Sequence, residues 1–112
     1  LEGSAKKLSA KYNCVAVLKT HRTIICKQDE IFTNQHGNSA LAKAGSGDVL
    51  AGMITGLLGE GLSVHEAAVH GVYLHGLAGD HAKHDLGAYS MIASDIIAHI
   101  KDVTGGNYEP VL

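Results

Sequence analysis

The spacing of apolar residues changes along the chain and divides it into two kinds of structure. Residues 4–12 place Ala5, Leu8 and Tyr12 at helical spacing, which predicts the end of an amphipathic helix with these side chains on its apolar face. Short apolar runs separated by polar turns follow, at 14–18, 23–26 and 31–33. The first run is continuous, as is typical of a strand buried on both faces. We therefore expect an antiparallel meander over 14–34.

From Asp48 onward the pattern predicts helices. Apolar residues recur at spacings of three and four and form one stripe: Val49, Leu50, Met53, Ile54, Leu57 and Leu58. Gly59 and Gly61 are expected to end this helix, because glycine adopts the backbone conformation that terminates helices. The stripe should pack against the core.

Two further helix starts follow. Ser63 and Glu66 have the spacing of a capping box, in which each side chain bonds the other residue's backbone amide. We expect the helix that they open to run to about His84. Ser94 and Asp95 can begin a last helix, because a carboxylate is favoured at the positive end of the helix dipole.

The 112 residues are enough for one compact domain, and the composition fits a globular core. The net charge of −2 gives no electrostatic case for nucleic acid or an anionic membrane as partner, and no apolar run approaches the ~20 residues of a membrane span. There is no signal-peptide pattern and no initiator Met, which fits a fragment. Cys14 and Cys26 lack metal or redox spacing and are expected to be buried free thiols in a reducing cytoplasm. Residues 105–112 are expected to form a C-terminal tail.

The segment with the most chemistry is Gly45-Ser46-Gly47-Asp48, a glycine loop that runs directly into the first long helix. Glycines let the backbone approach a ligand closely, and a helix N-terminus presents unpaired amides and a partial positive charge. Together they make an anion site suited to phosphate. Asp48 has two interpretations: it caps the helix, or it takes a proton from a substrate hydroxyl. The spacing fits neither a P-loop nor a dinucleotide-binding fingerprint.

The same loop resembles the Gly-Ala-Gly-Asp or Gly-Thr-Gly-Asp anion-hole motif of the ribokinase-like superfamily. The longer stretches 37–52, 71–80 and 93–95 are similar to the YjeF C-terminal family within it, whose members are NAD(P)H-hydrate repair dehydratases. This resemblance implies a ribokinase-like α/β fold. It also implies that residues 1–112 are the C-terminal, nucleotide-binding part of a single domain, a β-meander followed by helices.

The resemblance also implies where ligands bind. The family's nucleotide lies between a Lys-Gly-x-x-Thr turn and the glycine loop, and Thr20 stands here where that turn usually has glycine. The implied nucleotide-binding residues are Lys19, Thr20, His21, Arg22, Thr23, Asn38, Gly45, Ser46 and Gly47. Asp48 is the implied catalytic base and a substrate contact, and no residue is assigned as a metal ligand.

The implied reaction is the dehydration of NADHX or NADPHX to NADH or NADPH, with ADP or ATP as co-substrate and Mg²⁺ as cofactor. A cytoplasmic homo-oligomer, by resemblance a tetramer, is expected. Two alternatives stay open at this point. One is a ribokinase-like kinase of a vitamin-precursor alcohol, and the other is a non-catalytic nucleotide-binding fragment that needs its N-terminal half.

Eight histidines are many for this length. His70, His81 and His84 could share a helix face and bind a metal, but scattered histidines on a partly exposed helix are the favoured interpretation. His75 is expected to be a packed, hydrogen-bonded core residue. Lys43 either neutralises phosphate or is simply solvated.

Overall fold

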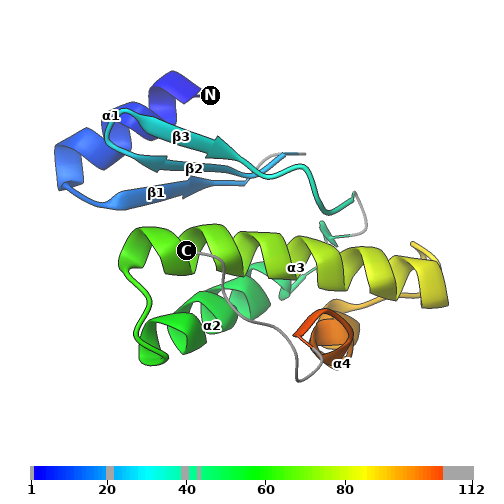
Figure 1. The fold of residues 1–112 in the computed structure, drawn as a ribbon. Coiled ribbons are helices and arrows are strands. Elements are labelled where there is room, and N and C mark those ends of the chain that lie inside the picture. Colours follow the sequence, from blue (N-terminus) through cyan, green and yellow to red (C-terminus); the bar gives the residue numbers. More distant parts are fainter. Residues whose placement is uncertain (1, 20–21, 39–40, 43, 105–112) are drawn as a thin grey trace.

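The computed structural model describes residues 2–19, 22–38, 41–42 and 44–104. The elements are α1 (Glu2–Tyr12), β1 (Val15–Leu18), β2 (Ile24–Lys27), β3 (Glu30–Thr33), α2 (Ser46–Gly59), α3 (Val64–Leu86) and α4 (Ala93–Thr104). In Figure 1, α1 covers one face of the sheet and α3 the other, with α2 and α4 beyond α3. The expected α/β architecture, a meander followed by helices, is confirmed. The expected tail, 105–112, lies outside the described residues.

The sheet has three antiparallel strands in the order β1-β2-β3. Val15 pairs with Lys27 at one end of β1, and Lys27 pairs in turn with Glu30 on β3. The turn between β2 and β3 is therefore confined to Gln28 and Asp29, and Gln28 takes a left-handed φ of 54°. This turn is shorter than the polar segment 27–30 between the two apolar runs suggests.

Burial on both faces of the sheet explains the continuous apolar runs. Because side chains alternate along a strand, neighbouring residues of β2 enter different cores. The core under α1 contains Ala5, Ala16, Ile24 and Cys26. The core toward α2 and α3 contains Ile25, Leu50, Ala68 and Val72. A third core joins α3 to α4 and contains Ala78, Ala82, Met91 and Ile96.

Of the three residues that the sequence places on one face of α1, only Ala5 is buried. Leu8 and Tyr12 are 46% and 63% exposed, whereas Ala5 and Ser9 are buried. The Ser9 hydroxyl donates to the Cys14 carbonyl and accepts the Gln28 amide at 2.7 Å. A small polar residue is needed at this face because it bonds the backbone of two turns.

The two cysteines also differ from each other. Cys26 is a buried free thiol as expected, but Cys14 is exposed and precedes β1, so the expectation of burial was wrong for it.

The helix boundaries follow the capping signals. α2 begins at Ser46, two residues earlier than expected, and ends at Gly59 as expected. Ser63 and Glu66 form the predicted capping box, with both amide-to-side-chain distances at 3.2 Å.

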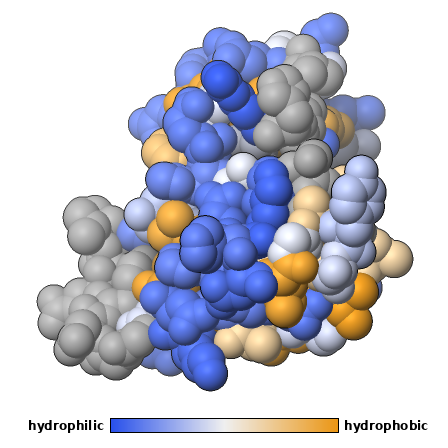
Figure 2. Space-filling model, turned by 90° about the vertical axis from the view of Figure 1, so that its right-hand side faces the viewer, coloured by the Kyte–Doolittle hydropathy of each residue, from blue (hydrophilic) through white to orange (hydrophobic). Residues whose placement is uncertain are grey.

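Figure 2 shows one face of the molecule, where apolar patches lie beside a hydrophilic band. None of the described helices combines the length and apolar character needed to cross a bilayer.

Candidate active site

The N-terminus of α2 is open. Its N-cap residue, Gly45, has a left-handed φ of 88° and makes no side-chain cap, so glycine is required there by conformation. Val49 donates the first helical hydrogen bond, to the Gly45 carbonyl. Within the described residues, the amides of Ser46, Gly47 and Asp48 have no hydrogen-bond acceptor. These three donors and the helix dipole favour an anion at this point.

Lys19, at the end of β1, reaches the same point. A Cβ placed on Gly47 would lie 3.5 Å from the Lys19 Nζ. Within the described part of the chain, Lys19 forms no ion pair with a carboxylate. An ammonium group beside the positive end of a helix is electrostatically unfavourable unless an anion lies between them. Lys19 and the amides of α2 thus form a candidate anion site.

His75 of α3 anchors the first residue of α2. Its Nε2 lies 3.1 Å from the Ser46 carbonyl oxygen and 3.2 Å from the Ser46 Oγ, and both residues are buried. A carbonyl only accepts, so Nε2 carries the hydrogen in that bond. Burial lowers the pKa of His75, the Lys19 charge lowers it further, and the bond to Ser46 opposes them. The ring is therefore kept neutral, and the expected packed core histidine is confirmed.

Asp48 lies in the first turn of α2 and is exposed. It does not cap the helix, because the N-cap is Gly45 and no side-chain cap bond is made. Its carboxylate borders an open pocket of about 510 Å³ between α2 and α4. The other lining residues are apolar or glycine: Val49, Gly52, Met53, Ile97 and Ile100. This position of Asp48, beside the candidate anion site and at an apolar pocket, is compatible with a general base, and that role stays a prediction.

The connection between β3 and α2 is clamped onto α3 by Asp80. One carboxylate oxygen accepts from Asn38 Nδ2 at 2.7 Å, and the other accepts from the Gly37 amide at 3.2 Å. A Cβ on Gly76 would lie 2.7 Å from the His36 carbonyl oxygen, so only glycine allows this close approach. Asn38, expected to bind nucleotide, has at least this structural role. The sequence analysis did not identify Asp80 as its partner.

The other predicted site residues are distributed as follows. Arg22 is exposed, and Thr23 is half-buried with its carbonyl accepting from the Asn34 amide at 2.9 Å. The expectations for Thr20, His21 and Lys43 lie outside the described residues.

The histidines of α3 do not gather into a metal site in the described part of the chain. His70 is half-buried, while His81 and His84 are exposed, as the interpretation of scattered histidines expects. A different group, Asp85, His99 and Asp102, has ligand atoms close together. The sequence analysis missed it.

A family model described as NAD(P)H-hydrate dehydratase matches residues 1–102. The chain belongs to the NAD(P)H-hydrate dehydratase family. It is 44% identical over 95 residues to the ADP-dependent (S)-NAD(P)H-hydrate dehydratase of Neisseria meningitidis, covering 83% of this chain and 32% of that protein. It is 36% identical over 111 residues to the bifunctional NAD(P)H-hydrate repair enzyme Nnr of Escherichia coli, covering 94% and 22%. This dehydratase-family chain thus spans about a third or less of these relatives.

Two solved structures share the fold of this chain. The ADP/ATP-dependent NAD(P)H-hydrate dehydratase of Bacillus subtilis, co-crystallised with ATP and Mg²⁺, superposes with a TM-score of 0.86 at 33% identity, covering 93% of this chain and 38% of that one. A protein of Streptococcus mutans, SMU.573, gives 0.81 at 29% identity, covering 95% and 39%. The predicted ribokinase-like resemblance and the α/β fold are thus confirmed. The assignment of residues 1–112 to the C-terminal part of the domain stays a prediction.

Proposed function

We propose that the full-length protein is an ADP- or ATP-dependent (S)-NAD(P)H-hydrate dehydratase and that this chain supplies its phosphate-binding loop and its base. One observation carries the proposal. Lys19 Nζ and the open N-terminus of α2 meet at one point, and the exposed carboxylate of Asp48 lies in the same helical turn. The relatives' names supply the reaction, and this geometry supplies the roles of the residues.

The nucleotide's terminal phosphates bind the amides of Ser46 and Gly47 together with the Lys19 ammonium. Arg22, Thr23 and Asn38, with Thr20 and His21, stay predicted contacts to the rest of the nucleotide. Donors fixed by helix and strand stabilise the charge that develops during phosphoryl transfer without having to reorganise.

Asp48 accepts the proton of the substrate's 6-hydroxyl while the hydroxyl oxygen attacks the terminal phosphorus. The bond from that phosphorus to the leaving nucleotide breaks. Phosphate is then expelled from the ring carbon by the ring nitrogen's lone pair, and loss of a proton from the neighbouring carbon restores the dihydronicotinamide. The chain's contribution is positioning and charge stabilisation.

Mg²⁺ enters with the nucleotide, as the crystallisation of the Bacillus subtilis enzyme with ATP and Mg²⁺ supports. Such an ion would be held mainly by the nucleotide's phosphates and by water, because the loop offers one exposed carboxylate, Asp48, and that is the proposed base. When bound, the ion neutralises phosphate charge. A tetrameric assembly, a cytoplasmic location and the lack of nucleic-acid or membrane partners stay predictions.

The full-length protein should convert NADHX to NADH with ADP or ATP and release one phosphate per turnover. Absorbance of NADH and a phosphate assay measure both products. Asp48→Asn should bind nucleotide nearly normally and lose ~10²–10⁴-fold in turnover. Asp29→Asn, the same change in the exposed β2–β3 turn, is the matched control and should retain activity.

Three outcomes would contradict the proposal. A stable phosphorylated alcohol from a thiamine-precursor substrate, without NADH from NADHX, would assign the protein to the kinases. Nucleotide binding without either reaction would favour a non-catalytic role. A loss of less than tenfold in a stable Asp48→Asn protein would remove Asp48 from the mechanism.

A further inference from the structure

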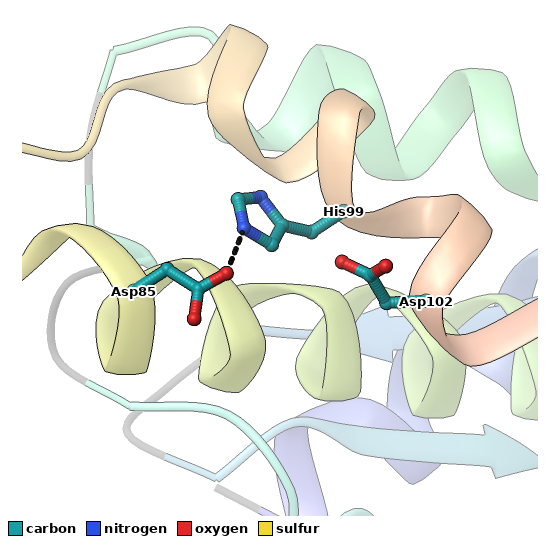
Figure 3. Close-up of side chains that lie close together, drawn as sticks. All are labelled: Asp85, His99 and Asp102. Atoms are coloured by element: carbon teal, nitrogen blue, oxygen red, sulfur yellow. Dashed lines mark hydrogen bonds and ion pairs between the residues drawn. The ribbon is translucent and has the colours of Figure 1, made fainter.

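Three potential metal ligands, none of them a residue of the phosphate loop, converge where α3 and α4 meet. Asp85 lies in the last turn of α3, and His99 and Asp102 lie one helical turn apart on α4. Their ligand atoms all lie within 4.8 Å of one another. Figure 3 shows the three side chains pointing toward one another from the two helices.

The orientation of His99 is fixed by its backbone contact. Its Nδ1 lies 2.7 Å from the Asp95 carbonyl oxygen, which only accepts, so Nδ1 carries a hydrogen. Its Nε2 lies 3.0 Å from Asp85 Oδ2, which is also an acceptor when ionised. A lone pair on Nε2 would face a carboxylate at this distance, so Nε2 requires a second proton or a cation. Histidines that bind metals commonly donate their other ring hydrogen to a backbone carbonyl in this way.

The site is preorganised yet reachable from solvent. Ala82, Met91 and Ile96 pack α3 against α4 with no exposed surface, so the two ligand-bearing turns are held together without an ion. The His99 side chain is 13% exposed, whereas that of Asp85 is 59% exposed and can admit an ion. Asp102 forms no ion pair within the described residues. If the imidazole is neutral, the negative charge of the two carboxylates is balanced by a divalent cation.

We propose that Asp85, His99 and Asp102 bind a divalent transition-metal ion of the Zn²⁺ class and thereby tie α4 to the end of α3. Mg²⁺ and Ca²⁺ prefer oxygen ligands alone, whereas one imidazole with two carboxylates suits Zn²⁺ and its neighbours. Neighbouring ligands of tetrahedral zinc lie about 3.3 Å apart, from bond lengths near 2.0–2.1 Å. The Nε2–Oδ2 distance of 3.0 Å is close to that value, and rotation of the exposed carboxylates can bring the remaining ligand atoms to it. Three protein ligands leave a position for water.

Calorimetric titration of the untagged, chelator-treated full-length protein with ZnCl₂ tests the site. We expect one Zn²⁺ per chain, bound at least tenfold more weakly by Asp102→Asn and by His99→Asn, and excess Mg²⁺ should not compete. His81→Gln, which alters an exposed histidine of α3 outside this group, and Asp29→Asn are the controls and should bind like the unaltered protein.

Several results would overturn the proposal. Absence of stoichiometric Zn²⁺ binding would mean that Asp85 pairs with His84 and His99 without a metal ion. Zn²⁺ binding unchanged by both ligand substitutions would locate it at other histidines. If His99→Asn does not fold, Asp102→Asn decides, because Asp102 is exposed and lies outside the apolar core. The site is independent of the proposed dehydratase activity, and a parallel ADP titration keeps the two outcomes distinguishable.

Discussion

Replacing Gly47 by valine tests the phosphate loop directly, because the structure separates its effect on folding from its effect on binding. Gly47 is exposed, lies in the first turn of α2 and does not have a positive φ. A Cβ at this position meets the Lys19 Nζ at 3.5 Å, an ordinary contact with the end of a flexible side chain. We therefore expect the free energy of unfolding to change by less than about 1 kcal/mol.

Nucleotide binding should respond far more strongly. The valine methyl groups would occupy the space between the Lys19 ammonium and the amides of α2, where phosphate must lie. Losing one charge-assisted hydrogen bond costs about 2–3 kcal/mol, which corresponds to roughly a 30- to 150-fold higher Kd for ADP. Turnover at low nucleotide concentration should fall in proportion.

Calorimetric titration of the full-length protein with ADP measures this loss, and thermal unfolding checks the fold. Gly56→Val is the matched control, because Gly56 lies in the same helix and a Cβ there meets nothing within 4 Å. Unchanged ADP affinity in a folded Gly47→Val protein would show that phosphate binds elsewhere and would refute the site as described.

Two further predictions concern the scaffold. Because burial lowers the pKa of His75 below 6.5, the unfolded state binds more protons there. The contribution of His75 to the free energy of unfolding should be fully present above pH 6.5 and be lost as the pH falls. Urea unfolding between pH 5 and 8 should therefore show a smaller loss of stability at low pH in His75→Gln than in the unaltered protein. An equal loss in both would exclude His75 as its source. Gly79→Val should lower the unfolding free energy by about 1–3 kcal/mol through overpacking against Leu41. Gly3→Val is the control and should leave the melting temperature nearly unchanged, because a Cβ there meets nothing within 4 Å. Equal melting temperatures of the two variants would contradict this packing.

Local pattern predicted most of the fold. The meander and the helices follow from apolar periodicity and from capping residues such as Ser63, which act over a few residues. The start of α2 was missed because Gly45 adopts a left-handed conformation that periodicity does not encode. The burial of Ser9 in α1 could not be predicted from apolar periodicity, because Ser9 accepts from the amide of Gln28, a partner distant in sequence.

The candidate site was predictable only in part. The chemistry of the glycine loop can be read locally, but the approach of Lys19 to Gly47 depends on how β1 and α2 pack, and only the family resemblance paired them beforehand. The group around His99 was missed because Asp85 comes from another helix. The local signal that was available is the spacing of His99 and Asp102, which places both on one face of α4.

The order of the packing has a consequence for folding. The three strands pair with their neighbours in sequence, and α2, α3 and α4 also pack in chain order. Such short-range contacts require little loop-closure entropy and favour rapid formation. The contacts that join the meander to the helical layer span more of the sequence, and they include the core around Ile25, Leu50 and Val72. The anion site depends on these contacts, since it brings Lys19 to Gly47. It should therefore form late, when these two parts dock, and a bound nucleotide should slow their separation more than it accelerates their formation.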